Sequence, residues 1–270
     1  MSARLRNNVT VTGTGPTTLV FAHGFGCDQV VWRFMAPAFE DRYRVVTFDL
    51  TGSGGSDLGA YDHARHGTLH GHADDLLEII DEIEGPVVYV GHSVSAMIGM
   101  LAGIKAPDRF LAQVMIAPSP CFIDDGDYRG GFSRGDIEEL IETMEANYLG
   151  WSSTMAPVIM GAPNLPHLGI ELTNNFCRND PDIARHFGRV TFMADHRADL
   201  PLVPARVPVL ILQCSDDLIA PREVGDYLQR QLAGSRLQEV RNVGHCPHMS
   251  APEDCVRLTQ DFLDSLGLRA

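Results

Sequence analysis

The chain has 270 residues, 44% of them hydrophobic, and its 21 basic and 35 acidic side chains give a formal charge of −14. This length supports one large core, and α/β folds of this size commonly carry an insertion. The negative charge argues against binding to nucleic acid or to an acidic membrane and favours a small neutral or apolar ligand. Six scattered cysteines without a CxxC pair, and no apolar run of signal-peptide or membrane-span length, predict a cytoplasmic protein.

Strand-like and helix-like segments alternate in the first half of the chain. Turn-forming residues at 12–16 separate the first two strands and predict an opening hairpin. The alternation predicts a mostly parallel central sheet with helices on both faces. The predicted strands are 9–11, 19–22, 43–48, 87–91 and 113–117, and the predicted helices are 29–39, 69–83 and 94–105.

The alternation stops at Pro118 and returns after about residue 200. Between these points the chain shows helical periodicity interrupted by prolines and glycines, with no convincing buried strand. We therefore expect an α/β core made of 1–118 and 198–270, with 119–197 inserted as a four-helix cap. The expected cap helices are 135–148, 152–160, 170–178 and 181–194, and the core resumes with strands 209–212 and 237–241 and helices 223–232 and 254–266.

The segment 87–99 predicts a strand, a sharp turn and a helix, with Ser93 at the apex of the turn. A serine in this position has its hydroxyl above the end of the sheet, and the first N–H groups of the helix face whatever it attacks. Taken alone the signal is weak, because a serine at such a turn is more often only a helix N-cap. Ser95 occupies the position where a glycine is usual, and as a small residue it still allows a tight turn.

Three residues that can form a catalytic relay each follow a predicted strand. Ser93, Asp217 and His245 occur in the order serine, acid, histidine, which is the order found in α/β-hydrolases. His245 can deprotonate Ser93, and an ionised carboxylate can hold the imidazole tautomer and stabilise the imidazolium. The spacing to Pro221 favours Asp217 as the acid, and the adjacent Asp216 is the alternative.

An early loop, His-Gly-Phe-Gly at 23–26, offers the second part of an oxyanion hole. Such a hole needs two backbone donors, one after the nucleophile and one from an early loop. The N–H groups of Val94 and Phe25 meet this description, and the glycines on either side of Phe25 allow close approach of the backbone. The joint occurrence of this loop, the turn at Ser93, the late aspartate and the last-strand histidine favours a catalytic site over coincidence.

Apolar residues of the cap can line a substrate pocket above Ser93, although apolar stripes on helices are more often packing contacts. Leu172 and Phe176 belong to this apolar set. The substrate pocket that we predict consists of Phe25, His92, Phe122, Phe132, Leu140, Trp151, Met155, Phe192 and Leu218.

Two groups of histidines invite a metal-binding interpretation. Their spacing is irregular, and no nearby carboxylates resemble a known ligand set. We therefore predict a solvated loop for the first group, no metal site and no cofactor. The first group is His63, His66, His70 and His72, and the second is Cys246 and His248 beside His245.

Four segments resemble one family along nearly the whole chain: 23–29, 91–99, 128–132 and 244–249. They are similar to the RsbQ-like family of bacterial stress-response regulators and to the plant karrikin and strigolactone receptor hydrolases. The resemblance implies an α/β-hydrolase fold under a V-shaped cap of four helices, a triad of Ser93, Asp217 and His245, and a small hydrophobic cavity. It also implies slow hydrolysis coupled to a regulatory protein, which in the bacterial case is a PAS-domain phosphatase. We expect the protein itself to be a monomer or weak dimer.

The leading functional hypothesis is a serine hydrolase of small hydrophobic esters or lactone-like compounds. A second hypothesis is a ligand-gated signalling protein that binds a regulatory partner, with hydrolysis incidental. A lyase or C–C bond hydrolase would use the same residues and stays open. Dehalogenases and epoxide hydrolases of this fold use an aspartate where this chain has Ser93, which argues against those activities.

Overall fold

A seven-stranded sheet forms the centre of the computed structural model, which describes residues 1–268. The strand order is β1-β3-β2-β4-β5-β6-β7; β1 runs antiparallel to β3, and every other neighbouring pair is parallel. The strands are β1 (Thr10–Thr12), β2 (Thr18–Ala22), β3 (Arg44–Phe48), β4 (Val87–His92), β5 (Phe110–Ile116), β6 (Val209–Asp216) and β7 (Arg236–Val243).

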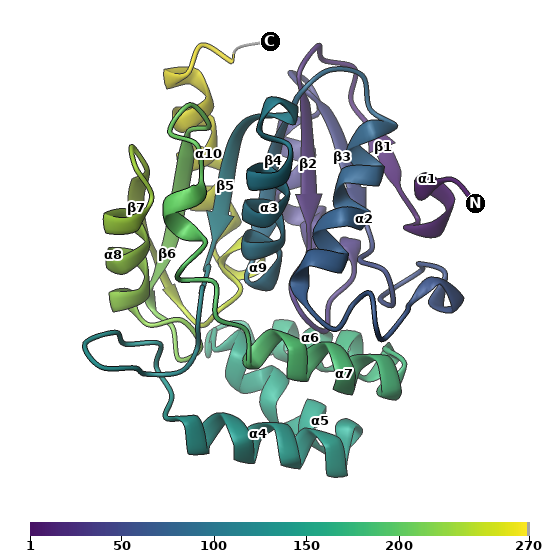
Figure 1. Cartoon of the computed structure of the whole chain (residues 1–270), viewed down its shortest axis with the longest axis vertical. Helices are drawn as coiled ribbons and strands as arrows, with labels where there is room; N and C mark the ends of the chain where they lie inside the picture. Colours follow the sequence, from purple (N-terminus) through teal and green to yellow (C-terminus); the bar gives the residue numbers. More distant parts are fainter. Residues whose placement is uncertain (269–270) are drawn as a thin grey trace.

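Helices cover both faces of the sheet, which explains why its central strands are continuously apolar. Every residue of β2 and β4 is buried, as expected for parallel strands that have helices on either side. In Figure 1, α2 and α3 lie in front of the sheet and α10 lies behind it. The fold predicted from the alternation of strands and helices is confirmed. The core helices are α1 (Ala3–Arg6), α2 (Leu69–Asp81), α3 (Val94–Lys105), α8 (Arg222–Gln231), α9 (Pro247–Ser250) and α10 (Pro252–Ser265).

Four further helices lie between β5 and β6 in the chain and across the carboxyl ends of the strands (Figure 1). In this view α6 and α7 lie nearer the sheet than α4 and α5. Helices α5 and α6 pack closely against each other, while α4 contacts α5 and α7. This layer, which we call the cap, closes the edge of the sheet where the functional residues lie. Its helices are α4 (Arg134–Ala146), α5 (Tyr148–Met160), α6 (Pro166–Arg178) and α7 (Pro181–Phe192).

Two local predictions are wrong. β1 pairs with β3 and not with β2, so the chain does not open with a hairpin of its first two strands. The segment 29–39 forms two short 3-10 helices, Gln29–Phe34 and Ala36–Phe39, where one helix was predicted. Pro37, which follows Ala36, has no N–H to donate and so does not support an uninterrupted helix. Among residues 1–268, no helix has both the length and the hydropathy needed to cross a membrane.

Candidate active site

The turn at Ser93 is a strained junction between β4 and α3. Ser93 has φ 55° and ψ −122°, a conformation that non-glycine residues rarely adopt. Gly91 makes the turn possible, because a Cβ atom there would lie 2.6 Å from the Ser95 carbonyl oxygen. The Tyr89 hydroxyl donates a hydrogen bond of 2.9 Å to that same carbonyl. These close backbone contacts stabilise the tight turn, which directs the serine away from the sheet.

Ser93, His245 and Asp217 form one hydrogen-bonded line at the carboxyl edge of the sheet. His245 Nε2 lies 2.8 Å from Ser93 Oγ, and His245 Nδ1 lies 2.7 Å from Asp217 Oδ2. All three residues are buried. The serine follows β4, the aspartate follows β6 and the histidine follows β7, so three separate strand ends supply the line. In this arrangement the imidazole can accept the serine proton while the carboxylate holds its other nitrogen.

The structure distinguishes between the two adjacent aspartates. Asp216 is exposed and is the last residue of β6, whereas the Asp217 side chain points to His245. Asp217 Oδ1 also accepts hydrogen bonds from the N–H groups of Ile219 at 2.8 Å and Ala220 at 3.2 Å. Burial raises the pKa of Asp217, but the nearby His245 and these backbone donors outweigh it, and the net pKa is lowered. The carboxylate is thus ionised when it contacts the imidazole.

The predicted oxyanion hole consists of two backbone N–H groups, those of Phe25 and Val94. Within residues 1–268, neither the Phe25 N–H nor the Val94 N–H donates a hydrogen bond to another protein group. Val94 is the first residue of α3, where the N–H groups of a helix lack internal acceptors. Gly24 packs directly against His92, because a Cβ atom there would lie 2.5 Å from His92 Nδ1. The loop can therefore approach the serine only with glycine at this position.

Ser95 connects the turn to the loop that carries Phe25. Its hydroxyl donates a 2.5 Å hydrogen bond to the carbonyl oxygen of His23, and its side chain is fully buried. The His23 ring is held in turn, because its Nε2 accepts a 3.0 Å hydrogen bond from the Leu50 N–H. The residue that replaces the usual glycine therefore anchors the peptide chain two residues before the Phe25 N–H.

His92 holds the backbone of His245 in place. Its Nε2 donates a 2.8 Å hydrogen bond to the backbone carbonyl of His245, and its ring lies 4.2 Å from that of the buried His248. Burial lowers the pKa of His92 to about 3, and it also lowers the pKa of His248. Both rings are neutral at ordinary pH, so His92 acts as a fixed hydrogen-bond donor that places His245.

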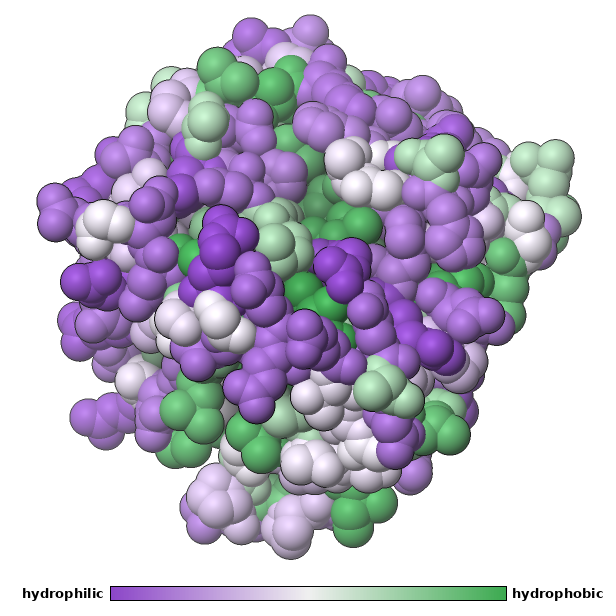
Figure 2. Space-filling view, turned by 60° about the horizontal axis from the view of Figure 1, so that its bottom comes forward, coloured by the Kyte–Doolittle hydropathy of each residue, from purple (hydrophilic) through white to green (hydrophobic). Residues whose placement is uncertain are grey.

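A narrow cavity lies between the strand ends and the cap, and Ser93 and His245 form part of its wall. Phe25, His92, Phe122 and Phe192 line it, as predicted. Most of its wall is apolar, which suits a small hydrophobic ligand. Seen from the side of the cap, the surface of the molecule is largely hydrophilic, with hydrophobic residues visible in a hollow near the centre of the view (Figure 2).

Five of the predicted pocket residues do not line this cavity. Trp151 is buried behind the wall, where its ring stacks on Phe176 with 6.0 Å between ring centroids. Leu218 is 66% exposed to solvent and does not belong to the cavity wall. The prediction counted apolar residues on the cap but could not tell which helix face meets the core. The other three, Phe132, Leu140 and Met155, are half-buried at positions away from the cavity.

The cavity wall also contains residues that the predicted list omitted. Leu172 and Phe176 belong to the wider apolar set and line the wall from one face of α6. Thr191 is the unexpected member, because its buried hydroxyl has no hydrogen-bond partner within residues 1–268. Most of the remaining omitted residues could have been found from the sequence, because they lie next to motif residues in the chain. The omitted wall residues outside α6 are Cys27, Ile159, Thr191, Ile219 and Cys246.

The histidines at 63–72 do not form one solvated loop. His63 and His70 are exposed, but His66 and His72 are buried, at 0% and 1% exposure. The sequence alone could not show this, because the burial comes from contact with α7: the His72 ring lies 4.5 Å from that of Phe187. The prediction of a solvated loop is therefore wrong for these two residues.

A parallel sheet with a serine, histidine and aspartate aligned at its carboxyl edge, beneath a helical cap, defines the α/β-hydrolase class of enzymes. The sequence agrees: residues 19–258 match the profile described as the alpha/beta hydrolase family, and the chain belongs to that family. It is an enzyme of the hydrolase class.

Individual relatives are similar over almost their full length. The chain is 41% identical to the strigolactone esterase D14 of Arabidopsis thaliana over 247 residues, 91% of each protein. It is 40% identical to the karrikin insensitive 2 receptor CA of Petunia hybrida over 250 residues, 92% of each. Among solved structures, a hydrolase from Oleispira antarctica superposes with a TM-score of 0.94 at 41% identity, covering 97% of this chain and 96% of the other.

Proposed function

We propose that this protein hydrolyses small hydrophobic esters or lactone-like compounds with Ser93 as the nucleophile. His245 takes the serine proton as Ser93 Oγ bonds to the carbonyl carbon, and Asp217 stabilises the imidazolium. The N–H groups of Phe25 and Val94 bind the oxyanion of the tetrahedral intermediate. His245 then protonates the departing alkoxide, and water releases the acyl group by the same steps. No cofactor takes part in these proposed reaction steps.

The observation that carries this proposal is the continuous hydrogen-bonded line from Ser93 through His245 to Asp217 at the wall of an apolar cavity. The names of relatives add support, because an esterase that is 41% identical covers 91% of the chain.

The cysteines bear on where the protein acts. All six are unpaired, which supports a reducing compartment such as the cytoplasm.

The test compares the wild type with Ser93→Ala on a panel of short acyl esters and butenolide-type lactones. Removal of the nucleophile of such a triad costs on the order of 10⁶ in kcat in a serine hydrolase. We expect turnover of the panel to be lost and labelling by a covalent serine probe to vanish. Equal labelling of both proteins would overturn the assignment of Ser93.

We propose further that turnover serves signalling, in the manner of the RsbQ-like regulators. The support is the similarity to a protein named as a receptor, which extends over 92% of the chain and includes the cap. In this second candidate function the occupied cavity favours binding of a regulatory protein, for example a PAS-domain phosphatase. The protein itself is then a monomer or weak dimer.

Pull-downs from the native organism, with and without a lactone ligand, test the signalling proposal separately from hydrolysis. A partner retained only with ligand supports it, and the absence of any partner under both conditions contradicts it. Complementation with Ser93→Ala then separates the two roles. Full restoration of the phenotype by this inactive variant means that hydrolysis is incidental, and failure means that turnover is the signal.

A further inference from the structure

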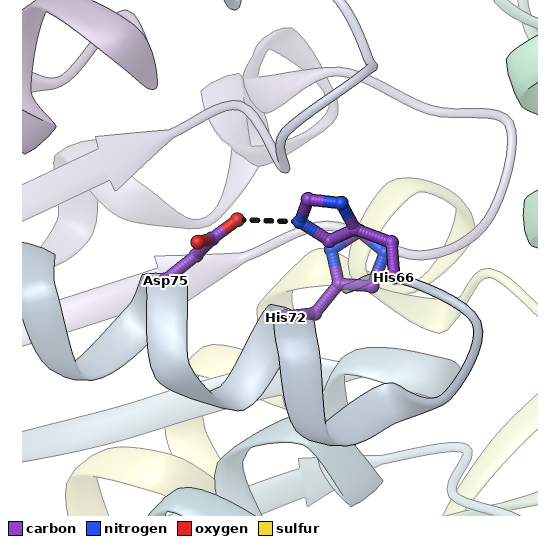
Figure 3. A group of neighbouring side chains, drawn as sticks. All are labelled: His66, His72 and Asp75. Atoms are coloured by element: carbon purple, nitrogen blue, oxygen red, sulfur yellow. Dashed lines mark hydrogen bonds and ion pairs between the residues drawn. The ribbon is translucent and has the colours of Figure 1, made fainter. Parts of the chain in front are cut away.

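Two buried histidines and a buried aspartate, His66, His72 and Asp75, meet outside the catalytic site (Figure 3). His72 and Asp75 lie three residues apart on α2, so they share one face of the helix. His66 comes from the preceding loop, and its Nε2 lies 2.9 Å from Asp75 Oδ2. One potential ligand atom from each of the three side chains lies within 4.8 Å of the others.

His72 is the observation that requires an explanation. Its side chain is 1% exposed, yet neither Nδ1 nor Nε2 has a hydrogen-bond partner within residues 1–268. A buried polar group without a hydrogen-bond partner destabilises the folded state. A neutral imidazole has one nitrogen with a lone pair, and in His72 no protein group within residues 1–268 uses it. A lone pair of this kind is what a transition metal binds.

We propose that His66, His72 and Asp75 bind one divalent transition-metal ion of the zinc class. Two imidazoles and a carboxylate form a donor set that zinc uses in proteins, with bonds of about 2.0–2.2 Å. Tetrahedral geometry then places ligand atoms about 3.4 Å apart. The present spacing, from 2.9 Å up to at most 4.8 Å, reaches that value through small side-chain rotations.

The surroundings of His66 offer its Nδ1 a hydrogen-bond partner in either tautomer, so the residue can become a metal ligand. Its Nδ1 lies 2.9 Å from the carbonyl oxygen of Asp62 and 3.1 Å from the Asp62 N–H. When Nε2 carries the proton, it donates to Asp75 and Nδ1 accepts from the Asp62 N–H. When the metal takes the place of that proton, the proton moves to Nδ1 and is donated to the Asp62 carbonyl. Such an outer partner is usual for a metal-bound histidine.

The carboxylate of Asp75 is similarly held in place. Its Oδ2 accepts a 2.5 Å hydrogen bond from the Thr51 hydroxyl, while its Oδ1 contacts the guanidinium groups of Arg65 at 2.5 Å and Arg6 at 3.5 Å. Arg6 and Arg65 also form ion pairs with Glu78. Without a metal ion, the negative charges of Asp75 and Glu78 therefore neutralise the positive charges of the two arginines. These contacts fix the carboxylate and leave Oδ2 facing the histidines.

The cluster also lies where the core meets the cap. The Tyr61 ring stacks on His66 at 4.6 Å, and its hydroxyl is 2.7 Å from His186 Nδ1 on α7. The His72 ring contacts Phe187 of the same helix. Metal binding at the cluster therefore stabilises this junction, and we expect it to raise the melting temperature in addition to being detectable as bound metal.

The experiment titrates chelator-treated, full-length protein with zinc chloride. We expect one Zn²⁺ per chain by elemental analysis, a rise in Tm, and zinc-edge X-ray absorption that shows two imidazole nitrogens and carboxylate oxygen. His72→Leu should weaken the affinity at least about 100-fold, because it removes a direct ligand. Exposed histidines of the same segment serve as matched controls: His63→Gln and His70→Gln should change the affinity less than about twofold.

Each result decides the matter. Absence of zinc binding by the wild type, or equal binding by His72→Leu, overturns the site, since a buried water molecule could then satisfy His72. Sulfur ligands in the absorption spectrum also overturn it, because they place the ion at cysteines. His72→Leu should fold, since it removes two unpaired polar atoms; if it does not, the spectrum of the wild-type complex decides alone.

Discussion

The floor and the roof of the cavity are built in different ways. The floor consists of Ser93, Asp217 and His245 with the loop at 23–26, and strand ends and backbone hydrogen bonds place it. The roof consists of the cap helices, and ring packing shapes it: the Phe25 ring lies 5.7 Å from each of Phe176, Phe187 and Phe192. The floor is directional because hydrogen bonds are, whereas aromatic contacts tolerate many combinations of residues.

This difference separates chemistry from selectivity. A change in the floor should lower kcat, because the residues proposed to act on the reacting atoms lie there. A change in the roof should alter which substrate fits and leave the chemical step intact. Hydrogen bonds also join the two regions: the His245 N–H donates to the carbonyl of Ile159 near the end of α5 at 2.8 Å, and the Asn179 side chain at the end of α6 donates to the carbonyl of Gly26 at 2.9 Å. The following predictions test how far the separation holds.

The largest effect is expected from Asp217→Asn on the floor. The amide cannot stabilise the imidazolium and favours the wrong tautomer of His245, which lowers kcat by about 10⁴ in a serine protease. We expect a similar fall here, measured by steady-state kinetics on a short acyl ester. Asp216→Asn is the matched control and should keep kcat within about twofold, because that side chain is exposed. A large loss in Asp216→Asn with kcat retained in Asp217→Asn would mean that Asp216 is the catalytic acid.

Acidic pH should lower the stability of the folded protein, because His92 is buried beneath the catalytic residues. His92 has its pKa lowered to about 3, against about 6.5 when unfolded. Below pH 6.5 the unfolded chain binds a proton that the folded chain does not, so stability falls as pH decreases from 6.5 toward 3. The loss is about 2 kcal/mol between pH 7 and pH 5.

Urea unfolding at pH 7 and at pH 5, with chelator present, measures this loss of unfolding free energy. In His92→Gln the difference in unfolding free energy between pH 7 and pH 5 should shrink by about 2 kcal/mol. His167→Gln, which replaces an exposed cap histidine, should leave the difference unchanged. An undiminished pH dependence in His92→Gln would show that His92 is already protonated in the folded protein.

A smaller effect is expected from Ser95→Ala, which removes the anchor of the oxyanion loop but not its donor. We expect kcat to fall about tenfold with KM unchanged, because complete loss of such a donor costs about 10²–10³. Ser119→Ala is the control, since its buried hydroxyl also donates to a carbonyl, that of Cys121 at 3.0 Å. If both variants lose only stability, Ser95 has no part in positioning.

The smallest effect is expected in the roof, from Thr191→Val. Within the described part of the chain, residues 1–268, the Thr191 hydroxyl in the cavity wall has no hydrogen-bond partner, and we expect it to bond a polar atom of the substrate. KM for lactones should rise about tenfold or less, as for one hydrogen bond. Thr259→Val removes another unpartnered buried hydroxyl, in α10, and should leave kcat and KM unchanged. Identical kinetics in both variants would show that Thr191 does not contact substrate.

Much of the floor was predictable because motifs are local. A serine between a strand and a helix, glycines beside Phe25 and an aspartate two residues before Ile219 are each set by neighbours in the chain, and parallel strands bring their carboxyl ends to one edge. The roof was predictable only as helices. Trp151 and Phe176 are both apolar cap residues, and the sequence does not say that one lies behind the other.

The sequence by itself determined the alternating strands and helices, the position of the cap and the order of the residues proposed for catalysis, because these depend on periodicity and short-range steric rules. Only the tertiary structure decided that Asp217 and not Asp216 meets His245, that Thr191 faces the cavity, and that His66 and His72 are buried beside Asp75. These outcomes depend on which side chains face one another across elements distant in the chain, and that information resides in packing rather than in local pattern.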